Sequence, residues 1–312
     1  MYENIEMRQI LCDGLDKLMA QDERIVVIDA DLAKANGTIS LRKKYPDRAF
    51  DVGVAEQNMT AVAAGMAAYG FIPFIGSFTA FATRRNCDQI TISLAYAKRN
   101  VKIIGSDPGI SAELNGGTHM SMEDIGVLRS IPGMVIYEPV DGVQLAKALP
   151  KIVDYCGPVY IRLFRKVAPI VFADDYEFDL FKGDKLRDGS DVTIFSTGIM
   201  VDESLKACES LKALGISAEV INIHTIKPID RETVINSAKK TGAVVTCENH
   251  NIIGGLKSAV CEVLIEDCPV PLRAIGVNDH FGEVAMMDYL KKKYHMTTED
   301  IVKAALEVIK LK

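Results

Sequence analysis

The first half of the chain alternates short apolar runs with amphipathic segments. Continuous apolar runs are typical of strands that are buried on both faces of a parallel sheet. They predict strands at 25–28, 49–52, 71–75, 101–104, 134–137 and 159–163. Apolar residues at helical spacing predict helices at 2–20, from Glu56 onward, at 82–99 and at 141–154. This alternation predicts parallel βαβ units and a doubly wound, mostly parallel α/β sheet.

Residues 167–190 interrupt this alternation. The segment is acidic and loop-like, and it includes Pro169, Gly183 and Gly189, so it predicts an interdomain linker. Beyond it, the pattern restarts with strands at 192–195, 218–223, 243–247 and 272–275 and helices at 201–214, 230–240, 255–266, 284–294 and 298–310. We therefore predict a first domain over residues 1–170, a linker over 171–190 and a second, smaller α/β domain over 191–312.

Composition and charge restrict the class of protein. With 312 residues and 48% hydrophobic content, the chain is long enough for two domains with sizeable cores. The formal net charge is −6, and basic residues are scattered among acidic ones, which argues against a nucleic-acid surface. No apolar run reaches membrane-spanning length, and the first residues lack the pattern of a signal peptide. The seven cysteines form no CxxC pair, so we expect reduced thiols in a cytoplasmic protein without membrane contact.

Polar and aromatic residues gather at the carboxyl ends of four predicted strands, which is the edge where such sheets bind ligands. The first domain places the segments 29–38, 53–56, 76–81 and 106–119 there. They contain Glu56 at a helix start, Phe78 and Phe81 three residues apart, and His119 after a glycine-rich turn. Taken singly, each has an ordinary explanation: an acid that suits a helix N-terminus, aromatic residues in a core, and a surface histidine. Their common edge favours a single site.

Three motifs in these segments resemble the pyrimidine-binding half of transketolase. They are Ala55-Glu56-Gln57-Asn58-Met59, the pattern Phe78-x-x-Phe81, and Gly117-Thr118-His119. The resemblance continues in order from Met7 to the C-terminus, but it matches only the C-terminal portion of a transketolase. It therefore implies one subunit of a split enzyme, which moves a two-carbon ketol unit from a ketose to an aldose with thiamine diphosphate as cofactor.

The resemblance also implies roles for individual residues. Glu56 would bond N1′ of the cofactor's aminopyrimidine and help its 4′-amino group to remove the proton from C2. Phe78 and Phe81 would pack on the pyrimidine ring. His119 would donate a hydrogen bond or a proton to a substrate oxygen.

Substrate-binding positions match the family less closely. The resemblance implies that Arg8 and Arg165 hold the phosphate of a sugar-phosphate substrate, because a planar guanidinium suits phosphate oxygens. At three other positions the chain departs from the family: Ala35 replaces a serine, Ser106 a histidine and Asn115 an aspartate. We expect Ser106 and Asn115 to contact substrate still, and we infer a different sugar, or a different polar terminus in place of phosphate.

The chain contains no Gly-Asp-Gly sequence, which begins the diphosphate and Mg²⁺ motif of this superfamily. The resemblance therefore implies a separate N-terminal subunit that holds Mg²⁺ and the cofactor's charged end, in an α₂β₂ assembly. The Ala/Gly-rich helix that begins at Glu56 suits either a tight interface or packing within its domain. The second half resembles the C-terminal domain of transketolases and of 2-oxo-acid dehydrogenase β subunits, which usually serves assembly. Its Gly254-Gly255 pair could instead cradle an anion at a helix start.

Other functions remain open at this point. The chain could be a 2-oxo-acid dehydrogenase β subunit or a deoxyxylulose-phosphate-synthase-like protein. The Gly-Thr-His loop argues against the first, and the lack of an N-terminal half argues against the second. The chain could also be a non-catalytic assembly subunit, in which case Glu56→Ala would leave the activity of the complex intact. The donor and acceptor sugars, the partner and the ability of the isolated chain to dimerise stay open.

Overall fold

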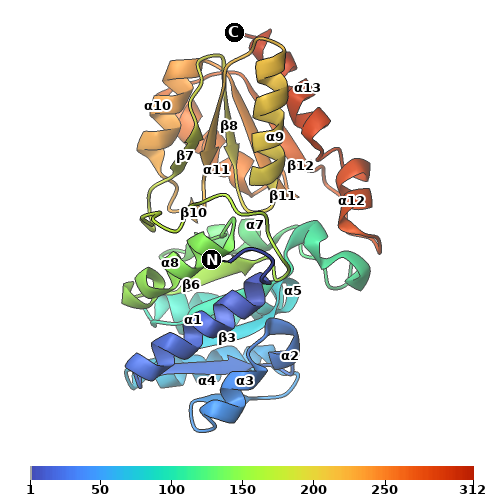
Figure 1. Cartoon of the computed structure of the whole chain (residues 1–312). Coiled ribbons are helices and arrows are strands. Elements are labelled where there is room, and N and C mark those ends of the chain that lie inside the picture. The colour runs from blue at the N-terminus through green and yellow to red at the C-terminus, as the bar shows by residue number, and fades with distance from the viewer. Residues whose placement is uncertain (1) are drawn as a thin grey trace.

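Two mostly parallel sheets form the framework of the protein, one in each half of the view in Figure 1. The computed structural model describes residues 2–312. The first sheet has seven strands in the order β10-β5-β6-β4-β3-β1-β2, and the second has five in the order β12-β11-β8-β9-β7. The expected fold class, a doubly wound α/β sheet followed by a second, smaller α/β domain, is confirmed.

Six parallel strands and two layers of helices build the first domain. The strands are β1 (Ile25–Asp29), β2 (Ala49–Asp51), β3 (Ile72–Phe78), β4 (Lys102–Ser106), β5 (Val135–Tyr137) and β6 (Val159–Leu163). One core contains side chains of α1 (Met7–Gln21), α3 (Ile39–Lys44) and α8 (Gly142–Asp154). The core on the other face contains those of α4 (Glu56–Ala68), η2 (Ile90–Tyr96) and α7 (Asp124–Arg129). A short helix, α2 (Ala33–Asn36), follows β1.

The second domain repeats this arrangement on a smaller scale. Its parallel strands are β8 (Val192–Ser196), β9 (Ala218–Asn222), β11 (Val244–Asn251) and β12 (Leu272–Val277). One face packs on α9 (Met200–Ala213) and α13 (Thr298–Ile309), and the other on α10 (Arg231–Thr241) and α11 (Leu256–Asp267). The chain also forms α12 (Met287–Lys293) before α13. No helix within residues 2–312 is long and apolar enough to cross a membrane.

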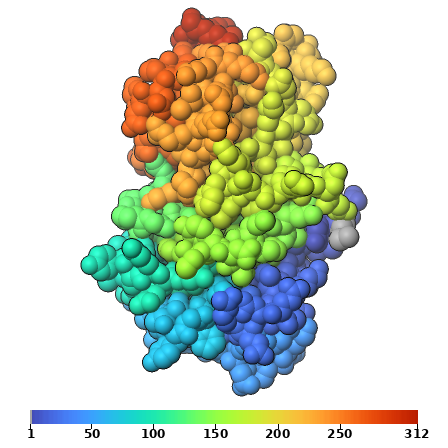
Figure 2. All heavy atoms as spheres, turned by 90° about the vertical axis from the view of Figure 1, so that its left-hand side faces the viewer, coloured from blue at the N-terminus to red at the C-terminus, as the bar shows by residue number. Residues whose placement is uncertain are grey.

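Two short strands at the junction were not expected. β7 (Asp184–Arg187) lies inside the expected linker and pairs antiparallel with β9 at the edge of the second sheet. Its side chains alternate between half-buried and exposed, and a charged edge strand of this kind has a weak apolar pattern. β10 (Thr225–Lys227) follows β9 in sequence but pairs antiparallel with β5 of the first sheet. Figure 2 shows the green and yellow segments packed across this junction. The domain boundaries at 170 and 191 stay a prediction.

The expected helix over 82–99 is interrupted. α5 (Thr79–Ala82) ends at Thr83, whose φ of −119° and ψ of −83° are not helical. The segments η1 (Arg84–Asn86), α6 (Cys87–Gln89) and the π-helical η2 follow. Thr83 Oγ1 donates a hydrogen bond of 2.7 Å to the carbonyl of Thr79, and such a bond competes with regular helix. The sequence Arg84-Arg85 therefore begins the short 3₁₀ segment η1 rather than continuing a regular α-helix.

Candidate active site

The candidate site lies at the carboxyl ends of β2, β3 and β4. After β2, Asp51 Oδ1 accepts a hydrogen bond of 2.6 Å from the backbone N–H of Gly53, which has a φ of +77°. Glycine adopts this left-handed conformation at little cost. The turn makes Glu56 the first residue of α4, where it is only 3% exposed. A carboxylate at this end of a helix is favoured by the helix dipole.

Arg85 is the partner of Glu56. Its Nη1 donates hydrogen bonds to both carboxylate oxygens of Glu56, at 2.8 and 2.9 Å. Arg85 is exposed, so it reaches the buried acid from the solvent side. Sequence reasoning missed this residue. The signal that could have identified it is Arg84-Arg85 at the start of a helical segment, where the helix dipole disfavours cations.

Aromatic rings connect this ion pair to His119. The guanidinium carbon of Arg85 lies 4.0 Å from the ring centre of Phe81. The His119 ring centre lies 5.1 Å from that of Phe81 and 5.9 Å from that of Phe78, both edge to face. The two phenylalanine rings are 6.4 Å apart. The structure thus brings four predicted site residues into one cluster: Glu56, Phe78, Phe81 and His119.

Arg165 extends the cluster beyond Phe78. Its guanidinium carbon lies 5.3 Å from the ring centre of Phe78, and its Nε lies 2.5 Å from Asp107 Oδ2. Asp107 is buried, and its Oδ1 has no hydrogen-bond partner within residues 2–312. Burial raises the pKa of the Asp107 carboxyl to about 6, against the opposing effect of Arg165. Arg165 therefore faces the cluster with a carboxylate already beside it.

Arg8 lies next to Arg165. The backbone N–H of Arg8 donates to the carbonyl of Arg165 at 3.1 Å. The side chain of Arg8 donates to Glu6 Oε2 at 2.7 Å and to the carbonyl of Ala35 at 3.3 Å. Both predicted substrate-binding arginines thus have an acidic partner, and Arg8 contacts the position where the family's serine is replaced.

Ser106 lies outside the cluster. It is fully buried, and its hydroxyl donates a hydrogen bond of 2.8 Å to Asn36 Oδ1. Asn36 Nδ2 donates to Asp29 Oδ1 at 3.2 Å, and Thr38 Oγ1 donates to Asp29 Oδ2 at 2.7 Å. Burial raises the pKa of the Asp29 carboxyl to about 6. Asn36 thus accepts the hydroxyl hydrogen of Ser106, whose side chain is buried, and contact of Ser106 with substrate stays a prediction.

The loop between β4 and α7 carries Asn115 and His119. Its first part forms the 3₁₀ segment η3 (Gly109–Asn115). The backbone N–H of His119 donates to the carbonyl of Gly116 at 3.0 Å, and His119 Nδ1 lies 2.9 Å from Thr118 Oγ1. Asn115 is half-buried on this loop, and its contact with substrate stays a prediction.

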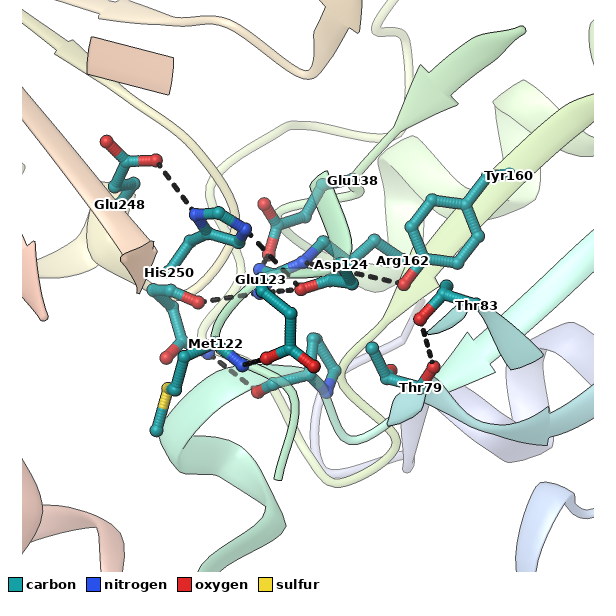
Figure 3. Close-up of polar contacts among 12 residues, drawn as sticks. Thr79, Thr83, Met122, Glu123, Asp124, Glu138, Tyr160, Arg162, Glu248 and His250 are labelled. Carbon is teal, nitrogen blue, oxygen red and sulfur yellow. Dashed lines mark hydrogen bonds and ion pairs between the residues drawn. The ribbon is translucent and has the colours of Figure 1, made fainter. Parts of the chain in front are cut away.

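A buried ionic network lies where the two domains meet (Figure 3). Arg162 Nε donates to Asp124 Oδ2 at 2.7 Å, and its Nη1 donates to Glu138 Oε1 at 2.6 Å. His250 of the second domain lies 3.9 Å from Asp124 Oδ1 and 3.8 Å from Glu248 Oε2. Burial by itself raises the pKa of Asp124, but the Arg162 guanidinium outweighs it and holds that pKa below its usual range. Sequence reasoning missed the network, because its members come from separate elements.

Glu248 fills the start of α11. Its carboxylate oxygens accept hydrogen bonds from the backbone N–H groups of Leu256 and Lys257, at 2.6 and 2.9 Å. A Cβ at Gly255 would collide with this carboxylate, so the glycine makes room for it. This arrangement corrects the alternative of an external anion at Gly254-Gly255, since an internal carboxylate already occupies the helix start.

The cluster around Glu56 suits a flat aminopyrimidine. It combines a buried carboxyl group, which can share a proton with a ring nitrogen, with aromatic rings that can pack on the heterocycle. His119 adds a polar group at the edge of both rings. Within residues 2–312, no group of three or more His, Cys, Asp or Glu side chains is arranged to hold a metal ion. The residues therefore fit the pyrimidine end of thiamine diphosphate.

Comparisons with known proteins agree with this interpretation. Residues 3–170 match the family model "Transketolase, pyrimidine binding domain", and residues 182–301 match "Transketolase, C-terminal domain". A 6-deoxy-6-sulfo-D-fructose transketolase subunit from Clostridium sp. (strain MSTE9) is 57% identical over 98% of this chain and 95% of its own. A putative transketolase C-terminal section from Methanocaldococcus jannaschii is 42% identical over 97% of this chain and 96% of its own.

A solved structure has the same fold over its full length. It is described as a split gene transketolase in an inactive β4 tetramer. It is 42% identical to this chain, has a TM-score of 0.92, and the match covers 99% of each chain. The chain therefore belongs to the transketolase family, as a subunit that corresponds to the enzyme's C-terminal section.

Proposed function

We propose that this subunit, together with an N-terminal subunit, transfers a two-carbon ketol unit from a ketose to an aldose. The carrying observation is the unbroken series of contacts from Glu56 through Arg85, Phe81 and His119 to Phe78 and Arg165. This series connects Glu56, which can bond the cofactor's pyrimidine, with Arg165, which can bind the anionic terminus of a substrate.

Each residue has a defined task in this proposal. Thiamine diphosphate, when bound, supplies the carbon nucleophile and the electron sink. Glu56 holds a proton shared with N1′ of the pyrimidine, and Phe78 and Phe81 orient that ring. His119 donates a hydrogen bond or a proton to the carbonyl oxygen of the substrate. Arg165, with Arg8 beside it, binds the anionic terminus.

The partner subunit supplies Mg²⁺ and the binding site for the diphosphate, and the complex is an α₂β₂ heterotetramer. Support comes from the lack of a Gly-Asp-Gly motif in the chain and from the neighbouring structure, whose β4 tetramer is described as inactive. Large apolar side chains next to the Glu56 helix are also exposed, among them Val54, Tyr69 and Tyr96. An uncovered apolar surface of this kind suits an assembly interface. The cytoplasmic location stays a prediction.

The anionic terminus in this proposal is a sulfonate. The relative from Clostridium is named for a sulfonated ketose, and the chain departs from the family at Ala35, Ser106 and Asn115. Arg165 and Arg8 already face the carboxylates of Asp107 and Glu6. A phosphate monoester carries about −1.5 to −2 charges near neutral pH, whereas a sulfonate carries one. A site whose arginines are partly neutralised therefore favours the monoanion.

The first test measures ketose-to-aldose transfer with thiamine diphosphate and Mg²⁺, for the chain alone and with its N-terminal partner. We expect activity only in the mixture, with a higher kcat/KM for 6-deoxy-6-sulfofructose than for fructose 6-phosphate. Activity of the chain alone would contradict the dependence on a partner. Pyruvate decarboxylation without ketol transfer would identify a different thiamine enzyme. Equal rates with the sulfonated ketose and with ordinary sugar phosphates would contradict the sulfonate assignment, but not the ketol transfer itself.

A further inference from the structure

The loop that carries His119 is built into the second domain. Residues 107–122 leave the first sheet after β4, yet four of their apolar side chains lie in the core that α9 and α13 cover: Ile110, Ala112, Met120 and Met122. The backbone N–H of Gly109 donates to the carbonyl of Ser121 at 2.9 Å, which closes the base of the loop. The position of His119 therefore depends on the second domain.

Asn249, in β11, joins the second domain to this base. Its Oδ1 accepts a hydrogen bond of 2.9 Å from the backbone N–H of Ile110, and its Nδ2 donates one of 2.9 Å to the carbonyl of Pro108. Two residues later, the backbone N–H of Asn251 donates to the carbonyl of Met122 at 2.8 Å. One strand of the second domain thus holds both ends of the loop.

The surroundings leave Asn249 little freedom. It is fully buried, and its own carbonyl accepts a hydrogen bond of 2.6 Å from Arg162 Nη2 of the buried ionic network. Gly109 has a φ of +56°, and a Cβ there would collide with the Asn249 side chain. A carboxamide offers both a donor and an acceptor, which the flanking carbonyl and N–H require.

The second domain also contacts the far end of the loop. A Cβ at Gly117 would collide with the carbonyl of Gly282, so the two backbones approach closely. The backbone N–H of Met287 donates to Glu113 Oε1 at 3.3 Å, and the other carboxylate oxygen of Glu113 pairs with Lys166 of the first domain. Contacts at the base and near the tip together set the direction in which His119 points.

We infer that Asn249 is a positioning residue for the transfer reaction. It touches no substrate, but it holds residues 107–122 so that Asp107 and His119 face the site. The second domain then serves catalysis as well as assembly. This inference rests on the proposed function, because His119 is taken to act on substrate. Removing the Asn249 side chain leaves a buried carbonyl and a buried N–H without partners, which loosens the loop.

The test uses Asn249→Ala in the complex with the N-terminal subunit. We expect amide hydrogen exchange in peptides covering residues 107–122 to become at least about tenfold faster. We expect kcat for transfer to fall at least about tenfold, while the apparent Kd of thiamine diphosphate changes by less than about twofold. Asn249→Asp is the second variant, because it keeps the shape and the acceptor but loses the donor. It should show the same two changes to a smaller extent.

Thr193→Val is the matched control. Thr193 Oγ1 makes buried hydrogen bonds to Glu219 and Thr241, inside the second domain and away from the loop. This variant should lower the thermal midpoint without changing kcat or exchange in 107–122. A folded Asn249 variant with wild-type kcat, or with unchanged exchange in the loop, would overturn the inference. A wild-type complex without transfer would instead refute the proposed function, and the exchange measurement would still decide whether Asn249 anchors the loop.

Discussion

A single nitrogen of Arg85, Nη1, binds both carboxylate oxygens of Glu56, at 2.8 and 2.9 Å. The acid that the transketolase motif assigns to the cofactor thus forms an ion pair with Arg85. A buried carboxylate without a partner is costly, so Arg85 stabilises the folded chain. If Glu56 has its proposed role, N1′ of the cofactor would share one of these carboxylate oxygens with Arg85.

Arg85→Ala should destabilise the cofactor-free chain by about 1–3 kcal/mol, because Glu56 stays buried without its partner. With saturating thiamine diphosphate and the N-terminal subunit, the deficit should become smaller, since N1′ then contacts the acid. Thermal midpoints with and without cofactor measure this difference. Arg84→Ala is the control, because Arg84 pairs with Glu123 at the surface. An equal deficit in both states would show that the cofactor does not share Glu56 with Arg85.

Glu56→Ala should reduce ketol transfer by the complex at least about a hundredfold, because the carboxylate that activates the pyrimidine is lost. Steady-state transfer assays measure the rate, and sedimentation of the complex checks that assembly is intact. Asn58→Ala alters an exposed residue of the same helix and should retain activity. A fully active Glu56→Ala complex would support a non-catalytic assembly subunit instead.

Asp107→Asn should shift substrate preference toward phosphate. The Asp107 carboxylate lies 2.5 Å from Arg165 Nε, so its removal leaves more positive charge for a dianion. We expect the ratio of kcat/KM for the phosphorylated ketose to that for the sulfonated ketose to rise about tenfold. Glu266→Gln changes the net charge equally at an exposed position on α11, and it should leave the ratio unchanged. An unaltered ratio in Asp107→Asn would remove the charge argument for sulfonate.

His224 should make the protein less stable at acidic pH. Burial lowers the pKa of its imidazole from 6.5 to about 4, and its Nε2 has no hydrogen-bond partner within residues 2–312. Asp184 Oδ2 lies 3.7 Å from Nε2 of His224, but burial raises the pKa of that carboxyl to about 6. In acid, Asp184 is therefore largely neutral and stabilises a charged imidazolium only weakly. The unfolded chain thus binds a proton that the folded chain does not, between pH 6.5 and about 4.

The free energy of unfolding is not reduced by His224 above pH 6.5, where the imidazole is neutral in both states. It falls as the pH is lowered toward 4, because only the unfolded chain takes up the proton. At about 1.4 kcal/mol per pKa unit, this loss amounts to roughly 3 kcal/mol. His224→Asn should therefore lose less stability than the wild type between neutral pH and about pH 4.5, as denaturant unfolding would measure. His295→Asn changes an exposed histidine and should keep the wild-type decline. An equal decline in His224→Asn would show that other groups cause it.

Much of the framework follows from local pattern. Strands buried on both faces of a parallel sheet are nearly continuous apolar runs, so β1, β3, β4 and β6 are visible in the sequence. Parallel strands end at a common edge, which is why Glu56, Phe78 and His119 could be grouped before their contacts were known. The assignment of Arg165 to substrate came from the family resemblance, and its guanidinium lies beside the ring of Phe78.

Other features depend on contacts between residues far apart in the chain. Arg85 reaches Glu56 because the helical segment breaks at Thr83, and Asn36 takes the hydroxyl of Ser106 across 70 residues. The strand β10, from the second half of the chain, pairs with β5 of the first sheet. Asn249, also from the second half, accepts a hydrogen bond from Ile110 in the loop that carries His119. Periodicity and motif spacing report only on neighbours along the chain. Which polar side chains become partners is decided by packing, because a buried donor or acceptor must bond to whatever the fold places next to it.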